Sequence, residues 1–160
     1  MYSIAIVDDD NKDIRALRIM LERYFKENGG EYGIAEFHDG SELMSDYSPK
    51  YDIVFLDIDM KELNGMAAAK RIRMTDESTA IIFVTRMAKY AIKGYEVSAL
   101  DFIVKPLYYY SFALKIKRAL NYVAANRKKL IELKVGSDIQ YIDENDIKYV
   151  ETLSHYLIYH

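Results

Sequence analysis

The sequence predicts a doubly wound parallel α/β domain followed by a short, mostly β segment. Two observations support this fold class. Through residues 1–126, short apolar runs alternate with amphipathic stretches, and the runs are continuously apolar, which is typical of strands buried on both faces of a parallel sheet. Near residue 129 this alternation stops, and short strands separated by turns follow. We therefore expect one domain over 1–126, and a linker with the beginning of a second domain over 127–160.

The first half of the α/β domain begins with a β-branched strand over 2–7. Apolar residues then recur at three- and four-residue steps from Ile14 to Phe25, which predicts a helix, and Gly29 and Gly30 end it. A strand over 33–38 and a helix over 39–47 follow, with Asp39 or Ser41 as the cap.

The second half repeats the same alternation. Apolar runs predict strands over 53–56, 81–84 and 100–104, and the stretches between and after them predict helices over 67–74, 87–95 and 111–127. Five strands thus alternate with five helices.

Beyond the α/β domain, short strands are expected over 130–135, 139–142, 147–150 and 156–159. So few short hairpins seldom form a stable domain alone. We therefore interpret this segment as the truncated start of a second, all-β domain.

Composition excludes several classes of protein. Among the 160 residues, 51% are apolar and 29% charged, which is typical of a globular chain. The absence of cysteine excludes a disulfide scaffold and thiolate metal sites. No uncharged run is long enough to cross a bilayer and no signal peptide is evident, so we expect a cytoplasmic protein without a membrane partner. The first 60 residues carry 14 acidic and 6 basic side chains, which suggests a cation or cationic partner.

Polar groups follow four of the predicted strands. Asp8 and Asp9 follow the first strand, Asp57 the third, Thr85 the fourth and Lys105 the fifth. In an open sheet of strand order 2-1-3-4-5, the switch point lies between strands one and three, so the three carboxylates would share a crevice. Carboxylates this close need a cation, and Mg²⁺ prefers oxygen ligands.

A phosphoryl group held by such a cation could pass to a carboxylate and form an aspartyl phosphate. Lys105 would neutralise one phosphoryl oxygen, and the Thr85 hydroxyl would donate to another. Each group by itself also has an ordinary structural interpretation, as a helix cap, turn residue or solvated loop. The order of these groups along the chain favours the interpretation that they form a phosphoryl-transfer site.

In this pattern, residues 1 to about 126 resemble the receiver domain of two-component response regulators, a flavodoxin-like fold. The resemblance implies that Asp57 is the phosphoacceptor and that Asp8, Asp9, Asp57 and the main-chain carbonyl of Asp59 bind Mg²⁺. A glycine eight residues after the acceptor, Gly65, also matches the family.

The resemblance further implies a conformational switch. Thr85 would move toward the phosphoryl group, Phe102 would turn inward, and Lys105 would precede a usually cis proline, Pro106. The implied partners are a sensor histidine kinase and, after phosphorylation, a second copy of the chain.

The β segment resembles the opening strands of LytTR-type DNA-binding output domains. The matching stretches are Glu132-Leu133-Lys134, residues 146–151 and Ser154-His155-Tyr156. The resemblance implies that His155 lies on a loop that reaches DNA and that the full-length output domain regulates transcription. A surface histidine beside aromatic residues is the alternative.

The chain departs from the receiver pattern at two places. Met60-Lys61 stands where the family usually has Met-Pro, and Arg86 stands where it usually has a small residue. We hypothesise that Arg86 shields the phosphoryl group from water, the alternative being an arginine that faces solvent.

Two other functions remain open. Ile53 to Asp59 also matches the Asp-x-Asp nucleophile motif of haloacid-dehalogenase-type phosphatases, but that family places its acidic metal pair late in the chain. A stand-alone receiver that acts by protein docking is the other. We expect no enzyme turnover, and the hydrolysis of small phosphoesters would discriminate.

Overall fold

The computed structural model describes residues 1–160 except 46, 128–129, 136–137, 144–145 and 155. It separates into two compact units, Met1–Ala125 and Asn126–His160. Among the residues described, none of the helices has the length and apolar character needed to span a membrane.

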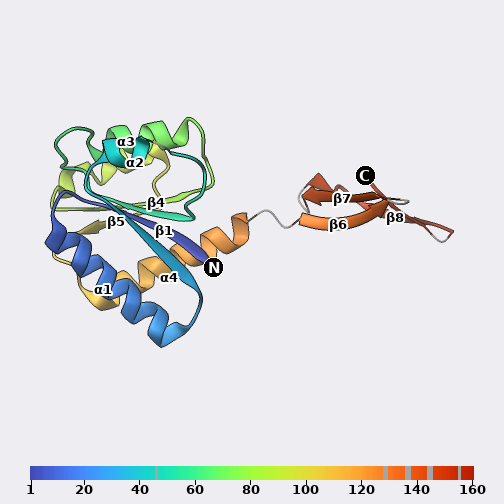
Figure 1. Cartoon of the computed structure of the whole chain (residues 1–160), viewed down its shortest axis with the longest axis horizontal. Helices are drawn as coiled ribbons and strands as arrows, with labels where there is room; N and C mark the ends of the chain where they lie inside the picture. The colour runs from blue at the N-terminus through green and yellow to red at the C-terminus, as the bar shows by residue number, and fades with distance from the viewer. Residues whose placement is uncertain (46, 128–129, 136–137, 144–145, 155) are drawn as a thin grey trace. The chain divides into compact units, whose positions relative to one another are not determined.

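The first unit is built on a five-stranded parallel sheet of order β2-β1-β3-β4-β5 (Figure 1). The strands are β1 (Tyr2–Val7), β2 (Tyr32–Phe37), β3 (Ile53–Leu56), β4 (Ala80–Thr85) and β5 (Asp101–Val104). This arrangement confirms the doubly wound fold and the strand order predicted from the sequence. All residues of β3 and β4 are buried, as continuous apolar runs require.

Helices cover both faces of the sheet (Figure 1). On one face lie α1 (Asn11–Asn28) and α4 (Tyr109–Asn126), and on the other α2 (Gly40–Met44) and α3 (Gly65–Arg73). Alternate residues of each strand supply the two cores: Ile4 and Ile6 pack with α1 and α4, whereas Ala5 and Val7 pack with α2 and α3.

The helix expected over 87–95 does not form as one continuous element, and the expectation was wrong in that respect. Two 3₁₀ helices occupy the region instead, η1 (Ala88–Tyr90) and η2 (Ile92–Val97). Neither has a side-chain cap, and η2 contains Gly94, which weakens a helix. Hydrogen bonds between residues three apart hold the segment. For example, the Tyr90 amide donates to the Met87 carbonyl, and the Gly94 amide donates to the Ala91 carbonyl.

The helix expected over 39–47 is shorter than predicted and ends at Met44. Asp39 is its N-cap, and the carboxylate accepts from the amide of Ser41 at 2.8 Å. The same carboxylate accepts from the amides of Glu62 and Leu63, each at 3.0 Å, and so fastens the loop after β3.

The second unit contains two antiparallel hairpins. Strands β6 (Leu130–Val135) and β7 (Asp138–Asp143) form one, and β8 (Val150–Leu153) and β9 (Tyr156–Tyr159) form the other. The strand expected over 147–150 was misplaced, because β8 begins at Val150. The turn decides this register: Ser154 adopts a positive φ of 57°, so pairing runs outward from Leu153 and Tyr156.

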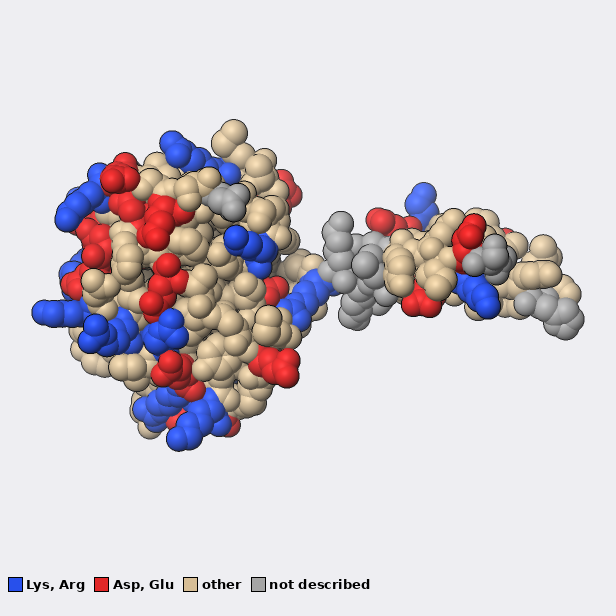
Figure 2. All heavy atoms as spheres, in the orientation of Figure 1, with Lys and Arg blue, Asp and Glu red and all other residues tan. Residues whose placement is uncertain are grey.

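Acidic and basic side chains are interspersed over the face of the first unit that Figure 2 shows. The excess of acidic residues at the start of the sequence therefore does not produce one uniformly acidic surface on this face.

Candidate functional site

Three carboxylates meet at the carboxyl end of the sheet. One oxygen from each of Asp8, Asp9 and Asp57 lies within 4.8 Å of the others. Asp8 and Asp57 are buried, with 4% and 6% of their surface exposed, whereas Asp9 is exposed. Asp9 is therefore the member of the cluster that solvent reaches.

The ends of β1 and β3 place these carboxylates. The amide of Asp57 donates to the carbonyl of Val7 at 2.9 Å, so the two strand ends stay paired up to the site. Asp57 Oδ1 accepts from the amide of Ile58 at 2.8 Å, and Asp8 Oδ1 accepts from the amide of Asp10 at 3.0 Å. Each buried carboxylate is thus oriented by its own strand–loop junction.

Lys105 enters the cluster from the end of β5. Its side chain is only 4% exposed, and Nζ lies 2.6 Å from Asp8 Oδ2 and 3.5 Å from Asp57 Oδ2. The Lys105 amide donates to the Thr85 carbonyl at 3.0 Å, which ties the end of β5 to that of β4. The Lys105–Pro106 peptide bond is cis.

Burial and ion pairing shift the pKa values of Asp8 and Lys105 in opposite directions. Burial raises the pKa of Asp8, although the hydrogen bonds from Lys105 and from the Asp10 amide oppose this. Burial alone would lower the pKa of Lys105, but its hydrogen bonds to Asp13 and Asp8 and the charge of Asp57 raise it overall. Lys105 therefore faces several carboxylates, and its one positive charge offsets only part of their negative charge.

The donor set fits Mg²⁺. All three side chains offer carboxylate oxygens, which a hard cation prefers, and Asp9 leaves the site open to water. Oxygens on one Mg²⁺ are at most about 4.2 Å apart. The three carboxylate oxygens lie within 4.8 Å of one another, close enough for one ion to bind all of them after a small adjustment of the side chains.

Asp13 belongs to this site, and sequence reasoning did not identify it. It lies in the first turn of α1, and its Oδ2 is 2.8 Å from Lys105 Nζ. The pattern of strand ends could not reveal it because it lies inside a helix. An acid near a helix N-terminus also has an ordinary explanation in the helix dipole.

Gly65 is required by close packing at the acceptor. A Cβ on this residue would lie 2.0 Å from the carbonyl oxygen of Asp57. The Gly65 amide donates to the carbonyl of Ile58 at 3.1 Å, which brings α3 against the end of β3. Asp59, whose carbonyl we expected to bind the metal, has an exposed side chain in the intervening loop.

The two expected switch residues lie on adjacent strands. Thr85 is fully buried at the end of β4, and its hydroxyl oxygen accepts from the amide of Met87 at 3.2 Å. Phe102 pairs in register with Phe83, and their ring centroids are 6.2 Å apart.

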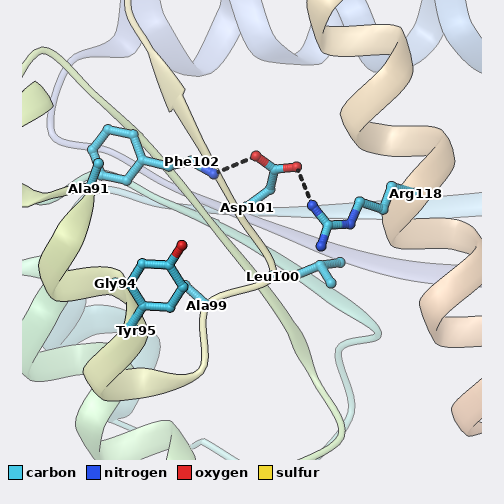
Figure 3. A pocket seen from close by; sticks show the side chains of 8 residues that line it. All are labelled: Ala91, Gly94, Tyr95, Ala99, Leu100, Asp101, Phe102 and Arg118. Carbon is cyan, nitrogen blue, oxygen red and sulfur yellow. Dashed lines mark hydrogen bonds and ion pairs between the residues drawn. The ribbon is translucent and has the colours of Figure 1, made fainter.

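A hollow of about 300 Å³ adjoins Phe102, and Figure 3 shows its lining from η2, β5 and α4. The Asp101 carboxylate accepts from the Phe102 amide at 2.8 Å and pairs with Arg118 at 3.4 Å. The backbone next to Phe102 is thus linked to α4, while space beside the ring remains open.

Two further expectations concern Arg86 and His155. Arg86 has a 67% exposed side chain, and its Nη2 lies 3.0 Å from Asp13 Oδ2, so it contacts the acidic site rather than facing solvent alone. His155, expected to reach DNA, lies outside the described residues.

The sequence is similar to a known protein family and to several regulatory proteins. Residues 4–116 match the response regulator receiver domain family. Sensory transduction protein LytT of Bacillus subtilis is 32% identical over 165 residues, covering 95% of this chain and 66% of that protein. Transcriptional regulatory protein LytR of Staphylococcus aureus is 38% identical over 81 residues, covering 50% of this chain and 31% of that protein.

Among solved structures, the response regulator TrrA of Thermotoga maritima, in complex with Mg²⁺-BeF, superimposes with a TM-score of 0.60. It is 30% identical, and the match covers 74% of this chain and 99% of that one. The family match spans more than half of the chain and includes all the carboxylates of the acidic cluster. The chain therefore belongs to the response regulator receiver domain family.

Proposed function

We propose that this protein accepts a phosphoryl group on Asp57 from a sensor histidine kinase, with Mg²⁺ as cofactor, in the cytoplasm. The observation that supports this most strongly is the convergence of Asp8, Asp9 and Asp57 within 4.8 Å, with Lys105 Nζ 3.5 Å from Asp57. A buried cation beside a metal-binding carboxylate cluster is suited to a transferring phosphoryl group.

In the proposed reaction, a carboxylate oxygen of Asp57 bonds to phosphorus while the bond between phosphorus and the kinase histidine breaks. The histidine nitrogen keeps the electron pair of the broken bond. Lys105 pairs with one phosphoryl oxygen, because it already lies between Asp8 and Asp57. Bound Mg²⁺ would neutralise further negative charge on the phosphoryl oxygens.

Phosphorylation would then act on Thr85 and Phe102. The phosphoryl group adds about two negative charges, which favours a hydrogen bond from the Thr85 hydroxyl. Met87 would follow because its amide is bonded to that hydroxyl, and the open hollow beside Phe102 leaves the ring room to change position. The proposed result is a second arrangement of η1, η2 and β5 that favours a homodimer or releases the output domain.

Labelling with acetyl phosphate tests the phosphoacceptor. The native chain should gain one Mg²⁺-dependent phosphoryl group, and Asp57→Asn should gain none, because the amide cannot form the acyl phosphate. Asp146→Asn, which changes an exposed carboxylate in the second unit, is the matched control and should label normally. Equal labelling of Asp57→Asn and the native chain would show that the proposal is wrong.

Hydrolysis of small phosphoesters separates a receiver from a phosphatase. A haloacid-dehalogenase-type enzyme would release phosphate from small phosphoesters in many turnovers and would use the side chain of Asp59. The notable acidic cluster of the described residues joins Asp8 and Asp9, early in the chain, to Asp57. We propose that the protein is not a turnover enzyme, and repeated release of phosphate from small phosphoesters would contradict this.

We further propose that the whole protein regulates transcription through a LytTR-type DNA-binding domain. The support is the resemblance of the β segment and the similarity to a relative named as a transcriptional regulatory protein. The chain spans 66% of the length of the Bacillus subtilis relative, so this proposal concerns the whole protein. Duplex DNA binding by the whole protein, strengthened by beryllofluoride, would support it, whereas protein docking without DNA binding would favour a stand-alone receiver.

A further inference from the structure

Asp13 joins the two cationic side chains beside the acidic cluster. Its Oδ2 lies 2.8 Å from Lys105 Nζ and 3.0 Å from Arg86 Nη2, so a single oxygen contacts both cations. The three residues come from the first turn of α1, the residue after β4 and the residue after β5. Elements distant in the sequence thus meet at one carboxylate.

The three side chains differ strongly in exposure. Lys105 is 4% exposed and Asp13 19%, whereas Arg86 is 67% exposed. An arginine this exposed ordinarily samples many rotamers. Here its guanidinium is bonded to a carboxylate that a buried lysine holds in place, and the Asp13 amide is fixed to the Asp10 carbonyl at 2.9 Å. The Asp13 carboxylate is therefore held in place, and the exposed Arg86 side chain is restrained by its bond to it.

This ion pair lines a hollow that also includes Lys105. Asp13, Arg86 and Lys105 line it together with Pro106 and Leu107, and its volume is about 540 Å³. Lys105 forms part of this hollow and also contacts the Asp57 carboxylate at 3.5 Å. The Arg86 guanidinium is therefore linked to the phosphoacceptor through two contacts, with Asp13 and then with the lysine that lies beside Asp57.

We propose that Asp13 is a positioning residue that holds Arg86 across this hollow and thereby slows hydrolysis of the phosphoryl group on Asp57. The inference rests on the proposed function. In hydrolysis, the water oxygen bonds to phosphorus, the bond from phosphorus to Asp57 breaks, and Asp57 leaves as a carboxylate. Both protons of the water go to the inorganic phosphate, which exchanges one of them with solvent.

Two other roles for Asp13 lead to different results. If Asp13 accepted the proton of the attacking water, its removal would slow hydrolysis. If it acted only by orienting Lys105, its removal would have the same effect whether or not Arg86 is present. A double-mutant cycle on Asp13 and Arg86 separates these roles from the proposed one.

The experiment labels each variant with acetyl phosphate, removes the donor, and follows loss of the phosphoryl group at fixed pH and Mg²⁺ concentration. We expect Asp13→Asn and Arg86→Ala each to lose it about twofold to fivefold faster, the range for loss of a partly exposed ion pair. The double variant should be no faster than either single variant. Arg86→Lys should keep most of the native lifetime, because an ammonium can still pair with Asp13.

The Arg18–Glu36 ion pair is the control. It joins α1 to β2 at 2.6 Å, and its side chains are 37% and 33% exposed. Arg18→Ala and Glu36→Gln should leave the rate of phosphoryl loss unchanged.

Unchanged or slower loss in Asp13→Asn, or additive effects in the double variant, would overturn the inference. Arg86 is too exposed for its removal to endanger folding, so an unchanged lifetime in Arg86→Ala would overturn it even if Asp13→Asn did not fold. A native chain that takes up no label on Asp57 would instead refute the proposed function. A labelled chain with unaltered lifetimes would refute only the role of Asp13.

Discussion

At the scale of single residues, the site depends on close contacts between groups that are far apart in the sequence. Lys105 Nζ contacts carboxylates from two other elements, at 2.6 Å from Asp8 and 2.8 Å from Asp13. A buried ammonium with such partners is strongly coupled to them, because an unpaired charge left behind would be costly. The residues of the site must therefore be understood as a group.

Gly65 gives a prediction at this scale. A Cβ there would lie 2.0 Å from the Asp57 carbonyl oxygen, so Gly65→Ala must displace the backbone of the proposed phosphoacceptor. We expect the free energy of unfolding to fall by about 1–3 kcal/mol, as for other overpacked sites. Denaturant unfolding measures this loss of stability. We also expect Gly65→Ala to bind Mg²⁺ more weakly than the native chain, which isothermal titration measures.

Gly33→Ala is the control for this prediction. Gly33 has no atom within 4 Å of the position of a Cβ, so its substitution should change stability by no more than about 0.5 kcal/mol. Equal destabilisation by the two substitutions would contradict the packing argument.

At the scale of elements, a buried polar network connects the segments after α2 and α3 with the start of β4. The Tyr47 hydroxyl donates to Asp76 at 3.1 Å, and the amides of Ser78 and Thr79 donate to the other oxygen of Asp76. Arg73, at the end of α3, donates to the carbonyls of Thr79 and Val97 and so joins η2 to the same network. These bonds lie away from the phosphoacceptor and hold the surrounding elements together.

Tyr47 makes this network sensitive to alkaline pH. Burial, with the nearby charge of Asp76, raises the pKa of Tyr47 to about 12. A tyrosine with a raised folded-state pKa contributes stability below its unfolded pKa of about 10, and this contribution is lost as pH rises toward the folded value. We therefore expect up to about 2 kcal/mol of stability to disappear between about pH 10 and pH 12.

Denaturant unfolding across that pH range, with Tyr47→Phe as the comparison, tests the prediction. The variant lacks the ionising hydroxyl, so its stability should fall less steeply over the same interval. Parallel curves for the native chain and the variant would rule out this role of Tyr47.

At the scale of the whole molecule, the two units differ in how much apolar surface they bury. The first unit has two cores on opposite faces of its sheet. The second unit exposes several large apolar side chains on its hairpins, among them Val135, Tyr141, Leu153 and Tyr156. Two-stranded sheets with exposed apolar residues have little stability of their own.

This difference predicts independent behaviour of the first unit. Residues 1–125 contain every residue of the acidic site, so a chain ending at 125 should bind Mg²⁺ with an affinity within about twofold of that of the intact chain. Isothermal titration of both chains measures this. Loss of Mg²⁺ binding in the shorter chain would mean that the second unit supports the site.

Residue patterns alone were sufficient for the sheet and for the expectation that carboxylates converge. Continuous apolar runs identify buried strands locally, and a parallel sheet brings successive strand ends to one edge, where Asp8, Asp9 and Asp57 indeed lie close together. They were insufficient for the segment over 88–97, because α- and 3₁₀-helical bonding differ by one residue in hydrogen-bond span. They also misplaced β8, whose register depends on the turn at Ser154.

The sequence by itself determined the fold class and the set of polar groups at the strand ends, because both follow from short-range periodicity, whereas the strand order 2-1-3-4-5 was expected from the resemblance to receiver domains. Only the tertiary structure decided that Asp13 and Arg86 join Lys105 and that a side chain at position 65 would strike the Asp57 backbone. The physical reason is that such contacts depend on distances of a few ångströms between elements far apart along the chain, which no local pattern encodes.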